Sequence, residues 1–552
     1  MSVPLARRLA RPEILNLPPV DVAPYGDGLR DTIKLHLNEN PFAPMSGGAL
    51  ATDLNRYPHP QPPALRQALA ALYAVRPDQL VVTRGADDAI DVLIRTFCRP
   101  GTDAIAVCEP TFSAYAHFAR VQGARVIETR LGDNFDLVPE QFLEAVGGDP
   151  SLKLAFICSP NNPTGNPVPP TDILTIADAL PETIIVADEA YIEFSELESL
   201  AAEAVRRDNL VVLRTLSKAY GLAGARIGCA IGEAGLIALI SLALPPFPIP
   251  SLSAEAALET LSPSRRPLHA ERIVRIKAER ERVAELLAAS PIVRKVRNGG
   301  ANFLFVEVDE PASLESKLSA LGIRVRFRPN AAPGGVRLTI GTPEENALAL
   351  TAFGIGSGRA TSRRAETLRD TKETRIAVAV DLDRPEPRRI DSGIPFFDHM
   401  LDQVAAHGGF SLILTCEGDL EIDAHHSLED CALAFGGALG KALGDRRGIG
   451  RFGFSLPMDE AEAHVLIDLS GRPYGQFEGA FAASHIGAYP TEMTPHIFRS
   501  LATSLGAAIH VRVQGDNDHH KTEACFKAFG RALRQAVAPE GAGTIPSTKG
   551  ML

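Results

Sequence analysis

The sequence has no excess of basic residues, no cysteine pair with CxxC spacing and no apolar run long enough to cross a bilayer. Its formal net charge of −11 argues against a general nucleic-acid-binding protein, whose basic surface would appear in this balance. Phosphorylated small molecules are not excluded, because a few local arginines and lysines can hold them. The longest apolar run, GLIALISLALPPF at 235–247, is too short for a membrane span and ends in prolines.

The seven cysteines are odd in number and scattered along the chain. This is typical of reduced thiols rather than of a disulfide framework. The first residues also lack the continuous apolar segment of a secretory signal. We therefore expect a cytoplasmic enzyme with neither a membrane nor a nucleic acid as its partner.

The composition, with 45% hydrophobic and 22% charged residues, is that of an ordinary globular protein. The length of 552 residues predicts three or four folded units. Short apolar runs that end in Pro, Asp or Ser alternate with helical patterns at 104–110, 154–160, 183–191 and 210–217. This alternation predicts an α/β fold with a sheet of mostly parallel strands and with its chemistry at their carboxyl ends. A long charged helix over 265–290 and a smaller α/β domain are predicted to follow.

Residues 354–372 lose hydrophobic periodicity and gather Gly, Ser, Thr and Arg. We therefore predict a linker at 356–372, between an N-terminal half at 1–355 and a C-terminal half at 373–552. Beyond this linker, apolar and polar residues alternate as in strands with one exposed face. The pattern predicts two structural halves fused in tandem.

Polar segments follow the predicted strands of the N-terminal half. RTLSKAYGLAGARIG places Lys218 after a buried strand, where a lysine can form a Schiff base with an aldehyde cofactor. DEAYIEF offers Asp188 for a protonated pyridine nitrogen and Tyr191 for a ring hydroxyl, and SPNNPTG offers Asn162 for the same hydroxyl. TRGADDAI (83–90) opens a helix whose free amides can hold a phosphate. A lone lysine in a turn is usually an ordinary surface residue, but the four segments together predict a pyridoxal phosphate site.

These segments resemble histidinol-phosphate aminotransferase, a fold-type I enzyme with a large and a small domain. The resemblance covers residues 1–355 and includes LNENPFAP (37–44), RYPHPQ (56–61) and VRLTIGT (336–342). It implies that Lys218 is the Schiff-base lysine and proton shuttle. The other cofactor contacts that it implies are Asp188 at the ring nitrogen, Asn162 and Tyr191 at O3′, Phe112 on the ring face, and Ala86, Asp87, Ser217 and Arg226 at the phosphate.

The same resemblance implies contacts beyond one cofactor. Tyr57 would reach a neighbour's cofactor across a two-fold dimer, and Arg337 would bind the carboxylate of glutamate or the phosphate of the substrate. Phe112 stands where the family often has tyrosine. Phenylalanine keeps the stacking on the ring and loses a hydroxyl, which affects the expected rate but not the reaction type.

The C-terminal half contains the pattern H-H-x-x-E twice, in DAHHSLED and in NDHHKTEA. On a helix, residues i and i+4 share one face, whereas i+1 points about 100° away. His425 with Glu429, and His519 with Glu523, can therefore each face one metal ion. The second histidine of each pair would then be directed at another ion.

The repeat extends upstream, where FFDHMLDQVAAHGG supplies His399 and MTPHIFRSLATSL supplies His496. Pseudo-symmetry then predicts one metal bound by His399, His426, His519 and Glu523, and another bound by His425, Glu429, His496 and His520. A single His-His pair is usually a surface feature, but its duplication favours metal ligands. Imidazole and carboxylate ligands suit an octahedral ion such as Mn²⁺. Histidines without a repeat partner are predicted to be structural: His407, His464, His485 and His510.

These motifs resemble imidazoleglycerol-phosphate dehydratase across about 366–552, an α+β domain of two internal repeats. The match also includes GIGRFG, PMDEA, DLSGRPY and PSTKGML. The resemblance implies two Mn²⁺ ions per site region and the loss of water from imidazoleglycerol phosphate to give imidazole acetol phosphate. Its further implied roles are Glu373 as an acid/base, Lys527 as a catalytic candidate, Gln403 at the substrate hydroxyls, and Arg451, Arg472, Ser547 and Lys549 at the phosphate.

The dehydratase product is the aminotransferase substrate, so the two resemblances together predict a bifunctional histidine-biosynthesis enzyme. Glutamate would donate the amino group and leave as 2-oxoglutarate. The resemblances imply a two-fold dimer through the N-terminal half and an octahedral 24-mer through the C-terminal half. The linker is long enough to permit both symmetries.

Three alternatives stay open from the sequence. The N-terminal half could act on another phosphorylated amino acid, as a threonine-phosphate decarboxylase does. The C-terminal half could be a non-catalytic, metal-bound assembly core, or it could be a metal-dependent hydrolase.

Overall fold

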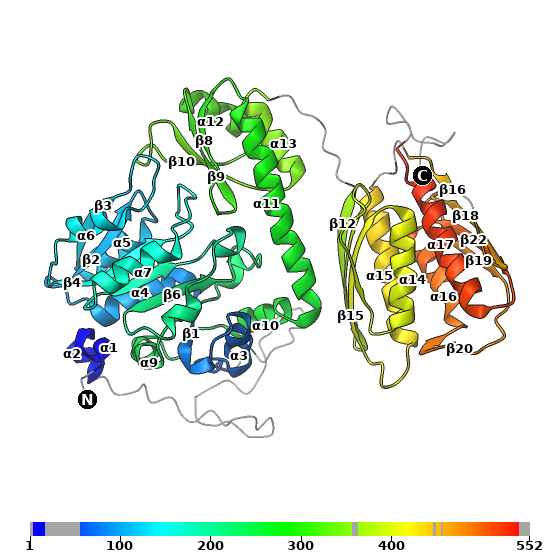
Figure 1. Ribbon diagram of the computed structural model, residues 1–552, viewed down its shortest axis with the longest axis horizontal. Helices are drawn as coiled ribbons and strands as arrows, with labels where there is room; N and C mark the ends of the chain where they lie inside the picture. The colour runs from blue at the N-terminus through cyan, green and yellow to red at the C-terminus, as the bar shows by residue number, and fades with distance from the viewer. Residues whose placement is uncertain are drawn as a thin grey trace. The chain divides into compact units, whose positions relative to one another are not determined.

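The computed structural model divides into two compact units, residues 1–261 with 272–359, and residues 262–271 with 360–552. Figure 1 shows their elements. The residues that the structure describes are 4–16, 54, 56–355, 363–444, 446, 449–453 and 456–539, the side chains of 456–458 excepted. Among the helices of these described ranges, none is long and apolar enough to cross a membrane.

A seven-stranded sheet forms the centre of the first unit, in the order β1-β7-β6-β5-β4-β2-β3. Its strands are β1 (Leu80–Thr83), β2 (Ala104–Glu109), β3 (Arg125–Arg130), β4 (Leu152–Cys158), β5 (Ile184–Asp188), β6 (Leu210–Thr215) and β7 (Gly228–Ile231). Neighbouring strands pair in parallel except around β7, which is antiparallel to β1 and β6. The predicted, mostly parallel sheet is confirmed.

Helices cover both faces of this sheet because successive strand residues point to opposite sides. Ile184 and Val186 of β5 pack into one core with α1, α4, α5 and α9. Ile185 and Ala187 pack into the other core with α3, α6, α7, α8 and α10. The helices are α1 (Leu5–Leu9), α2 (Pro12–Leu15), α3 (Pro63–Leu72), α4 (Gly85–Phe97), α5 (Ala114–Gln122), α6 (Pro139–Val146), α7 (Pro170–Ala179), α8 (Ala201–Ala204), α9 (Ala234–Leu242) and α10 (Ser251–Thr260).

A smaller antiparallel sheet, in the order β10-β11-β9-β8, follows the long helix. The predicted charged helix and smaller α/β domain are therefore confirmed. The elements are α11 (Arg266–Ala288), β8 (Val293–Arg297), β9 (Phe303–Val308), α12 (Pro311–Ala320), β10 (Arg326–Phe327), β11 (Gly335–Thr339) and α13 (Pro343–Ala352). β10 and β11 place Arg326 directly opposite Arg337.

The second unit contains two sheets with matching topology, β12-β13-β15-β14 and β16-β18-β22-β19. In each, the two inner strands are antiparallel and the last strand is parallel to its neighbour. The first copy is β12 (Arg364–Asp370), β13 (Thr374–Asp381), β14 (Arg388–Asp391), α14 (Pro395–Gly408), β15 (Ser411–Gly418) and α15 (His425–Leu443). The second is β16 (Phe452–Gly453), β17 (Leu456–Met458), β18 (Ala461–Asp468), β19 (Tyr474–Glu478), α16 (Met493–Leu505), β22 (Ala508–Gln514) and α17 (Asp518–Ala536), with a β20–β21 hairpin (His485–Ile486, Tyr489–Pro490) before α16.

The helices of the second unit lie between its two sheets (Figure 1). Val378 of β13, Val465 of β18 and residues of all four helices share one core. Contacts cross between the repeats, with α15 against α16 and α14 against α17. Side chains from different repeats therefore meet along these helix pairs.

The prediction of a linker at 356–372 is wrong for residues 364–370. Residues 364–370 form β12, which pairs with β13 from Arg364 opposite Asp381 to Asp370 opposite Arg375. The stretch RAETLRD shows no clear apolar alternation because β12 is an edge strand with mostly half-buried side chains. Backbone pairing rather than side-chain burial stabilises such a strand. Residues 356–362 lie outside the described residues.

We predict opposite effects of alanine at two helical glycines of the second unit. A Cβ on Gly530 of α17 would lie 2.6 Å from the carbonyl oxygen of Val404 on α14, whereas a Cβ on Gly437 meets nothing within 4 Å. Gly530→Ala should lower the free energy of unfolding by about 1–3 kcal/mol because α14 and α17 must separate. Gly437→Ala should raise it by up to about 1 kcal/mol because alanine favours the helix.

Urea unfolding followed by circular dichroism would compare these two variants with the wild type. Equal stability of the two variants would contradict the close packing of α14 against α17.

Candidate active sites

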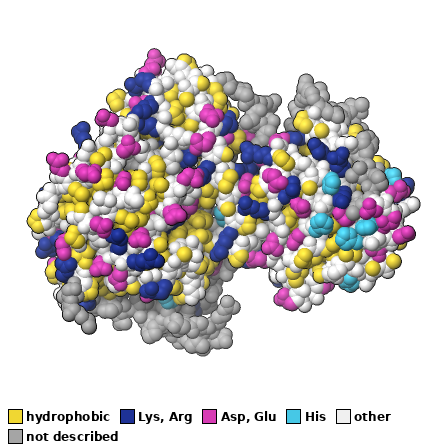
Figure 2. Space-filling view, viewed as in Figure 1, with side chains coloured by type: hydrophobic (Ala, Val, Ile, Leu, Met, Phe, Trp, Pro, Cys, Tyr) yellow, Lys and Arg dark blue, Asp and Glu magenta, His cyan; other side chains and the backbone are white. Residues whose placement is uncertain are grey.

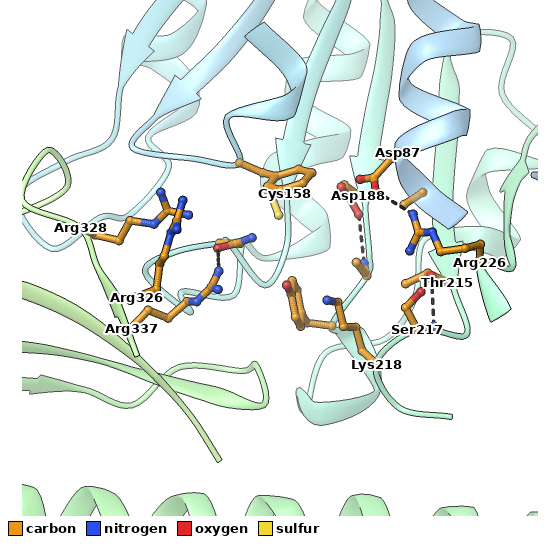
Figure 3. A pocket seen from close by; sticks show the side chains of 15 residues that line it. Asp87, Cys158, Asp188, Thr215, Ser217, Lys218, Arg226, Arg326, Arg328 and Arg337 are labelled. Atoms are coloured by element: carbon orange, nitrogen blue, oxygen red, sulfur yellow. Dashed lines mark hydrogen bonds and ion pairs between the residues drawn. The ribbon is translucent and has the colours of Figure 1, made fainter. Parts of the chain in front are cut away.

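A cavity of about 420 Å³ lies at the carboxyl ends of β4, β5 and β6 (Figure 3). All the residues predicted to bind the cofactor line it, except Tyr57: Ala86, Asp87, Phe112, Asn162, Asp188, Tyr191, Ser217, Lys218 and Arg226. These residues are far apart in the sequence. They meet because parallel strands end at the same edge of the sheet.

Asp188 is the last residue of β5 and is buried, with 3% of its surface exposed. The hydroxyl of Tyr115 donates to Oδ2 at 2.7 Å, and the amide N–H of Ala190 donates to Oδ1 at 3.1 Å. Burial raises the pKa of Asp188 to about 6, although both hydrogen bonds act to lower it. A carboxylate with this pKa can pair with a protonated ring nitrogen at neutral pH.

Lys218 follows β6, and its Nζ lies 5.5 Å from the centre of the Tyr191 ring. Desolvation in the cavity is the main cause that lowers the pKa of Lys218, and the positive charge of Arg337 is the next. Both effects favour the neutral, nucleophilic amine. Tyr191 is buried, and its burial raises the pKa of its phenol, so that its hydroxyl stays protonated.

The start of α4 forms the end of the cavity that suits a phosphate. Backbone N–H groups in the first turn of a helix have no partner within that helix and can bind an anion. Arg226 lies beside this turn, with Nη2 2.9 Å from Oδ2 of Asp87. A Cβ on Gly228 would lie 2.7 Å from the carbonyl carbon of Gly85, so only glycine lets β7 approach the turn this closely.

Three arginines, Arg326, Arg328 and Arg337, line the opposite side of the cavity from its acidic residues, Asp87 and Asp188 (Figure 3). Arg337 donates to Oδ1 of Asn162 at 2.5 Å. The buried Nε atoms of Arg328 and Arg337 have no hydrogen-bond partner among the described residues. Burial, followed by the charges of Arg326 and Arg337, lowers the pKa of Arg328. Such a cluster is suited to bind an anion.

Of these three arginines, the sequence motifs predicted only Arg337 as a binding residue. The alternation R-x-R in IRVRFRP places Arg326 and Arg328 on the same side of an extended segment, and it could have indicated the other two.

Tyr57 does not line the cavity of its own chain. Its side chain is 50% exposed, and its ring stacks on that of Phe247 with 4.6 Å between the centroids. The expectation that it reaches a neighbour's cofactor stays a prediction. The motif LNENPFAP (37–44) lies outside the described residues.

In the second unit, ligand atoms of His425, Glu429 and His496 lie within 4.8 Å of one another. Nε2 of His496 is 3.2 Å from Oε1 of Glu429, and Nε2 of His425 is 3.7 Å from Oε2. The Nε2 atom of His496 is buried and has no hydrogen-bond partner in the part of the chain that the structure describes. Lone pairs that converge in this way suit a divalent cation.

A second group has the same arrangement, but here the upstream histidine comes from the first repeat and the His-Glu pair from the second. His399 of α14 places Nε2 3.8 Å from Oε1 of Glu523 on α17, and His519 places Nδ1 3.6 Å from Oε2. Nζ of Lys527 lies 2.8 Å from Oε1 of the same glutamate. In both groups the upstream histidine thus comes from one repeat, and the His-Glu pair comes from the other.

The predicted four-ligand groups are not formed within one chain, because the second histidine of each pair makes other contacts. Nδ1 of His426 lies 3.3 Å from Asp419 and 3.8 Å from Glu373. Nδ1 of His520 lies 2.8 Å from Glu460. The pKa of His426 is raised by the hydrogen bond that its ring donates to Asp419, and the pKa of His520 by the hydrogen bond that its ring donates to Glu460. The divergence is the one that the helical geometry predicted, and the four-ligand groups stay a prediction.

Glu460 is a candidate residue that the sequence reasoning missed. Glu373 directly precedes β13, Glu460 directly precedes β18, and each contacts the second histidine of its own repeat. Asp459, Glu460 and His520 also place ligand atoms within 4.8 Å of one another. The internal repeat was the signal that could have indicated Glu460.

The other predicted substrate contacts are spread over the unit. Gln403 lies on α14 one helical turn after His399, and Arg472 is exposed after β18. Arg451 forms two contacts with Asp468, at 2.6 and 3.1 Å. Figure 2 shows histidine side chains gathered on the visible face of this unit, among acidic and basic side chains. The predicted phosphate contacts Ser547 and Lys549 lie outside the described residues.

Comparison with known families decides the classification of the first unit. Residues 30–353 match the family "Aminotransferase class I and II", which is more than half of the chain. The chain belongs to this family. Residues 392–533 match a second family, imidazoleglycerol-phosphate dehydratase.

Curated relatives include histidine biosynthesis bifunctional protein HisB from Stenotrophomonas maltophilia (strain R551-3). It is 58% identical over 190 residues, which are 34% of this chain and 53% of the relative. The HisB protein of Actinobacillus pleuropneumoniae serotype 3 (strain JL03) is 56% identical over 190 residues, 34% of this chain and 52% of the relative. The chain spans about half the length of the curated relatives it matches.

Solved structures similar to the first unit include two histidinol-phosphate aminotransferases. The one from Sinorhizobium meliloti, in complex with pyridoxal 5′-phosphate, has a TM-score of 0.51 and 24% identity over 55% of this chain and 83% of its own. The one from Clostridium acetobutylicum has a TM-score of 0.50 and 23% identity over 54% of this chain and 90% of its own. These likenesses show the fold.

We predict that Asp188→Asn stabilises the cofactor-free protein above pH 6 by about 2–3 kcal/mol. The folded-state pKa of Asp188, about 6, lies above the unfolded value near 4, so the wild type loses stability as the pH rises between these values. Asparagine does not ionise and avoids this loss, and the two proteins should differ little below about pH 4. Urea unfolding across this pH range would measure the difference.

Asp103→Asn is the matched control with the opposite sign. Asp103 is equally buried, but hydrogen bonds from Arg99 outweigh the effect of burial and lower its pKa. This variant should be less stable than the wild type at neutral pH, and the deficit should shrink as acid protonates Asp103. A stability gain for Asp103→Asn, or none for Asp188→Asn, would contradict the electrostatics of these sites.

Proposed function

We propose that the chain is a bifunctional enzyme of histidine biosynthesis. Its C-terminal half would convert imidazoleglycerol phosphate into imidazole acetol phosphate. Its N-terminal half would transaminate that product with glutamate to give histidinol phosphate and 2-oxoglutarate. The observation that carries this proposal is a cavity with Lys218 and Asp188 at one end and three arginines at the other.

The residues of the cavity fit pyridoxal phosphate. When bound, this cofactor supplies an electron-withdrawing ring to the amino-acid substrate. Asp188 would pair with its ring nitrogen, and Asn162 and Tyr191 would donate to O3′. Ser217, Arg226 and the first turn of α4 would hold its phosphate. Lys218 would hold the cofactor covalently and transfer protons at the reacting carbon.

The arginine cluster favours a phosphorylated substrate over a neutral one. Arg328 and Arg337 have buried Nε–H groups that no described residue satisfies, and an anion could satisfy them. Glutamate and imidazole acetol phosphate both carry an anionic group away from the reacting carbon. A group of three guanidinium ions would allow both substrates to bind in the same cavity in turn.

The two histidine–glutamate groups of the second unit fit Mn²⁺, which supplies Lewis-acid polarisation of the substrate when bound. His425, Glu429 and His496 would hold one ion, and His399, His519 and Glu523 would hold the other. The chain would act as a homo-oligomer, with His426 and His520 directed to ions of neighbouring copies.

The remaining groups would act on the substrate itself. Glu373 and Glu460 are placed beside the diverging histidines to move protons. Gln403 would contact the substrate hydroxyls, and Arg451, Arg472, Ser547 and Lys549 would bind its phosphate. Lys527 would keep Glu523 in its ligating orientation through their 2.8 Å contact.

We predict that the protein, given pyridoxal phosphate, glutamate and imidazole acetol phosphate, forms histidinol phosphate and 2-oxoglutarate. Lys218→Ala should lower this rate by about a thousandfold or more, because no other amine among the described residues lines the cavity. Mass spectrometry would follow both products. Lys295→Ala, which removes an exposed lysine bonded to Asn134, should leave the rate unchanged. Loss of CO₂ from a phosphorylated amino acid, without transamination, would instead favour a decarboxylase.

A separate prediction concerns the metal. We expect two Mn²⁺ per chain by elemental analysis after dialysis, and formation of imidazole acetol phosphate from imidazoleglycerol phosphate without pyridoxal phosphate. His425→Ala should lose about one ion and reduce turnover by at least about a hundredfold, because a ligand is missing. His464→Ala, outside both groups, is the control. Metal binding without turnover in the wild type would support an assembly core instead.

A further inference from the structure

Tyr115 of α5 is a fully buried tyrosine to which the proposed chemistry gives no task. Its ring stacks on Phe156 of β4, with centroids 4.8 Å apart and planes 14° apart. It also meets Phe112 edge to face at 5.6 Å. Phe112 lines the cavity, so the ring of Tyr115 supports one wall of the cofactor site from behind.

The hydroxyl of Tyr115 reaches the carboxylate that would meet the ring nitrogen of the cofactor. It donates to Oδ2 of Asp188 at 2.7 Å, while the N–H of Ala190 donates to Oδ1. Each carboxylate oxygen thus has one fixed donor. Because two donors at fixed positions define the plane of a carboxylate, they also set the direction in which it can accept a further proton.

Other titratable groups also face Asp188, from each element packed around it. They are Cys158 of β4, Asp87 of α4, Lys218 after β6 and Tyr191 after β5. Burial raises the pKa of the Cys158 thiol, so that it stays neutral, and its Sγ contacts the carbonyl oxygen of Pro160. Asp87 and Lys218 act on Asp188 only through their charges, in opposite directions.

Among these influences, the hydrogen bond from Tyr115 is the largest that favours the ionised form of Asp188. Burial raises the pKa of the Tyr115 phenol well above its usual range, so the hydroxyl remains a donor at any working pH. The donor therefore does not switch off within the range in which Asp188 titrates.

We propose that Tyr115 is a positioning residue, whose hydroxyl holds the Asp188 carboxylate in the orientation and charge state that the ring nitrogen of pyridoxal phosphate requires. This inference rests on the proposed function of the N-terminal half, in which Asp188 meets that nitrogen. It adds a residue that does not line the cavity and that acts through Asp188.

The test is the affinity of Tyr115→Phe for pyridoxal phosphate, measured from the absorbance of the bound cofactor. Phenylalanine keeps both ring contacts and removes only the donor. The dissociation constant should rise about tenfold, which is the size expected for a hydrogen bond to a charged group. The pH below which affinity falls should move up by about one unit, because Asp188 then protonates more easily.

Tyr489→Phe is the matched control. Tyr489 is also fully buried, and its hydroxyl forms one hydrogen bond, at 2.9 Å, to Thr494 in the second unit. Its loss removes a buried phenol hydroxyl of the same kind and should change neither the cofactor affinity nor its pH dependence.

Asp188→Asn separates a positioning role from a structural one. Combined with it, Tyr115→Phe should cause little additional loss of affinity, because the charge that the hydroxyl supports is absent. A tenfold loss that persists in the double variant would show a purely structural role and overturn the inference. So would unchanged affinity and pH dependence of Tyr115→Phe in a wild-type background that binds the cofactor. Failure of the wild type to bind pyridoxal phosphate would instead overturn the proposed function itself.

Discussion

A charged side chain can stay buried only where neighbours satisfy its hydrogen bonds or its charge, and both candidate sites of this chain are built around that constraint. Asp188 is 3% exposed and has a donor on each oxygen. Glu523 is 7% exposed and is held by Lys527 and faced by two histidines. In each case the carboxylate is oriented before any cofactor or metal arrives. Such preorganisation lowers the cost of binding, since the protein does not need to reorganise.

The two sites meet this constraint with different architectures. In the first unit, the groups come from the carboxyl ends of parallel strands. Polar side chains at these ends lie outside the apolar core, so they do not interrupt its packing. In the second unit, the groups come from helix faces, where residues four apart share a side and adjacent residues diverge. The sheet edge therefore gathers many different residue types into one cavity. The helices instead repeat one small set of ligands twice.

The difference between strand ends and helix faces also explains which site residues the sequence predicted and which it did not. The polar residues after each strand predicted the cavity because a parallel sheet leaves little freedom in where strand ends lie. Arg326 and Arg328 were not predicted, because the R-x-R alternation that indicates them surrounds a strand of only two residues and is a weak signal by itself. The strand β12 was not predicted, because an edge strand is stabilised by its backbone pairing, here with β13. Such pairing does not require a regular alternation of apolar and polar side chains. The contact of Tyr115 was not predicted, because its partner, Asp188, lies 73 residues away in the sequence and no local pattern links the two.

The histidine–glutamate groups show which contacts an internal repeat can predict and which it cannot. The repeat correctly indicated that a histidine upstream of one pair meets the His-Glu pair of the other, as His399 does with Glu523. It could not show that His426 and His520 contact carboxylates of their own repeats, because an internal symmetry relates both arrangements equally well.

The divergence of these histidines bears on the assembly. Three protein ligands leave positions open on a divalent ion, and a histidine that points away from its own group is available to fill one in a neighbouring copy. Tyr57 is half exposed and does not line the cavity of its own chain. Each half of the chain thus carries predicted site residues that lie outside the corresponding group or cavity of its own copy, as the proposed homo-oligomer requires. In the proposed homo-oligomer, a copy that associates through one half would also bring the other half of its chain close to a partner.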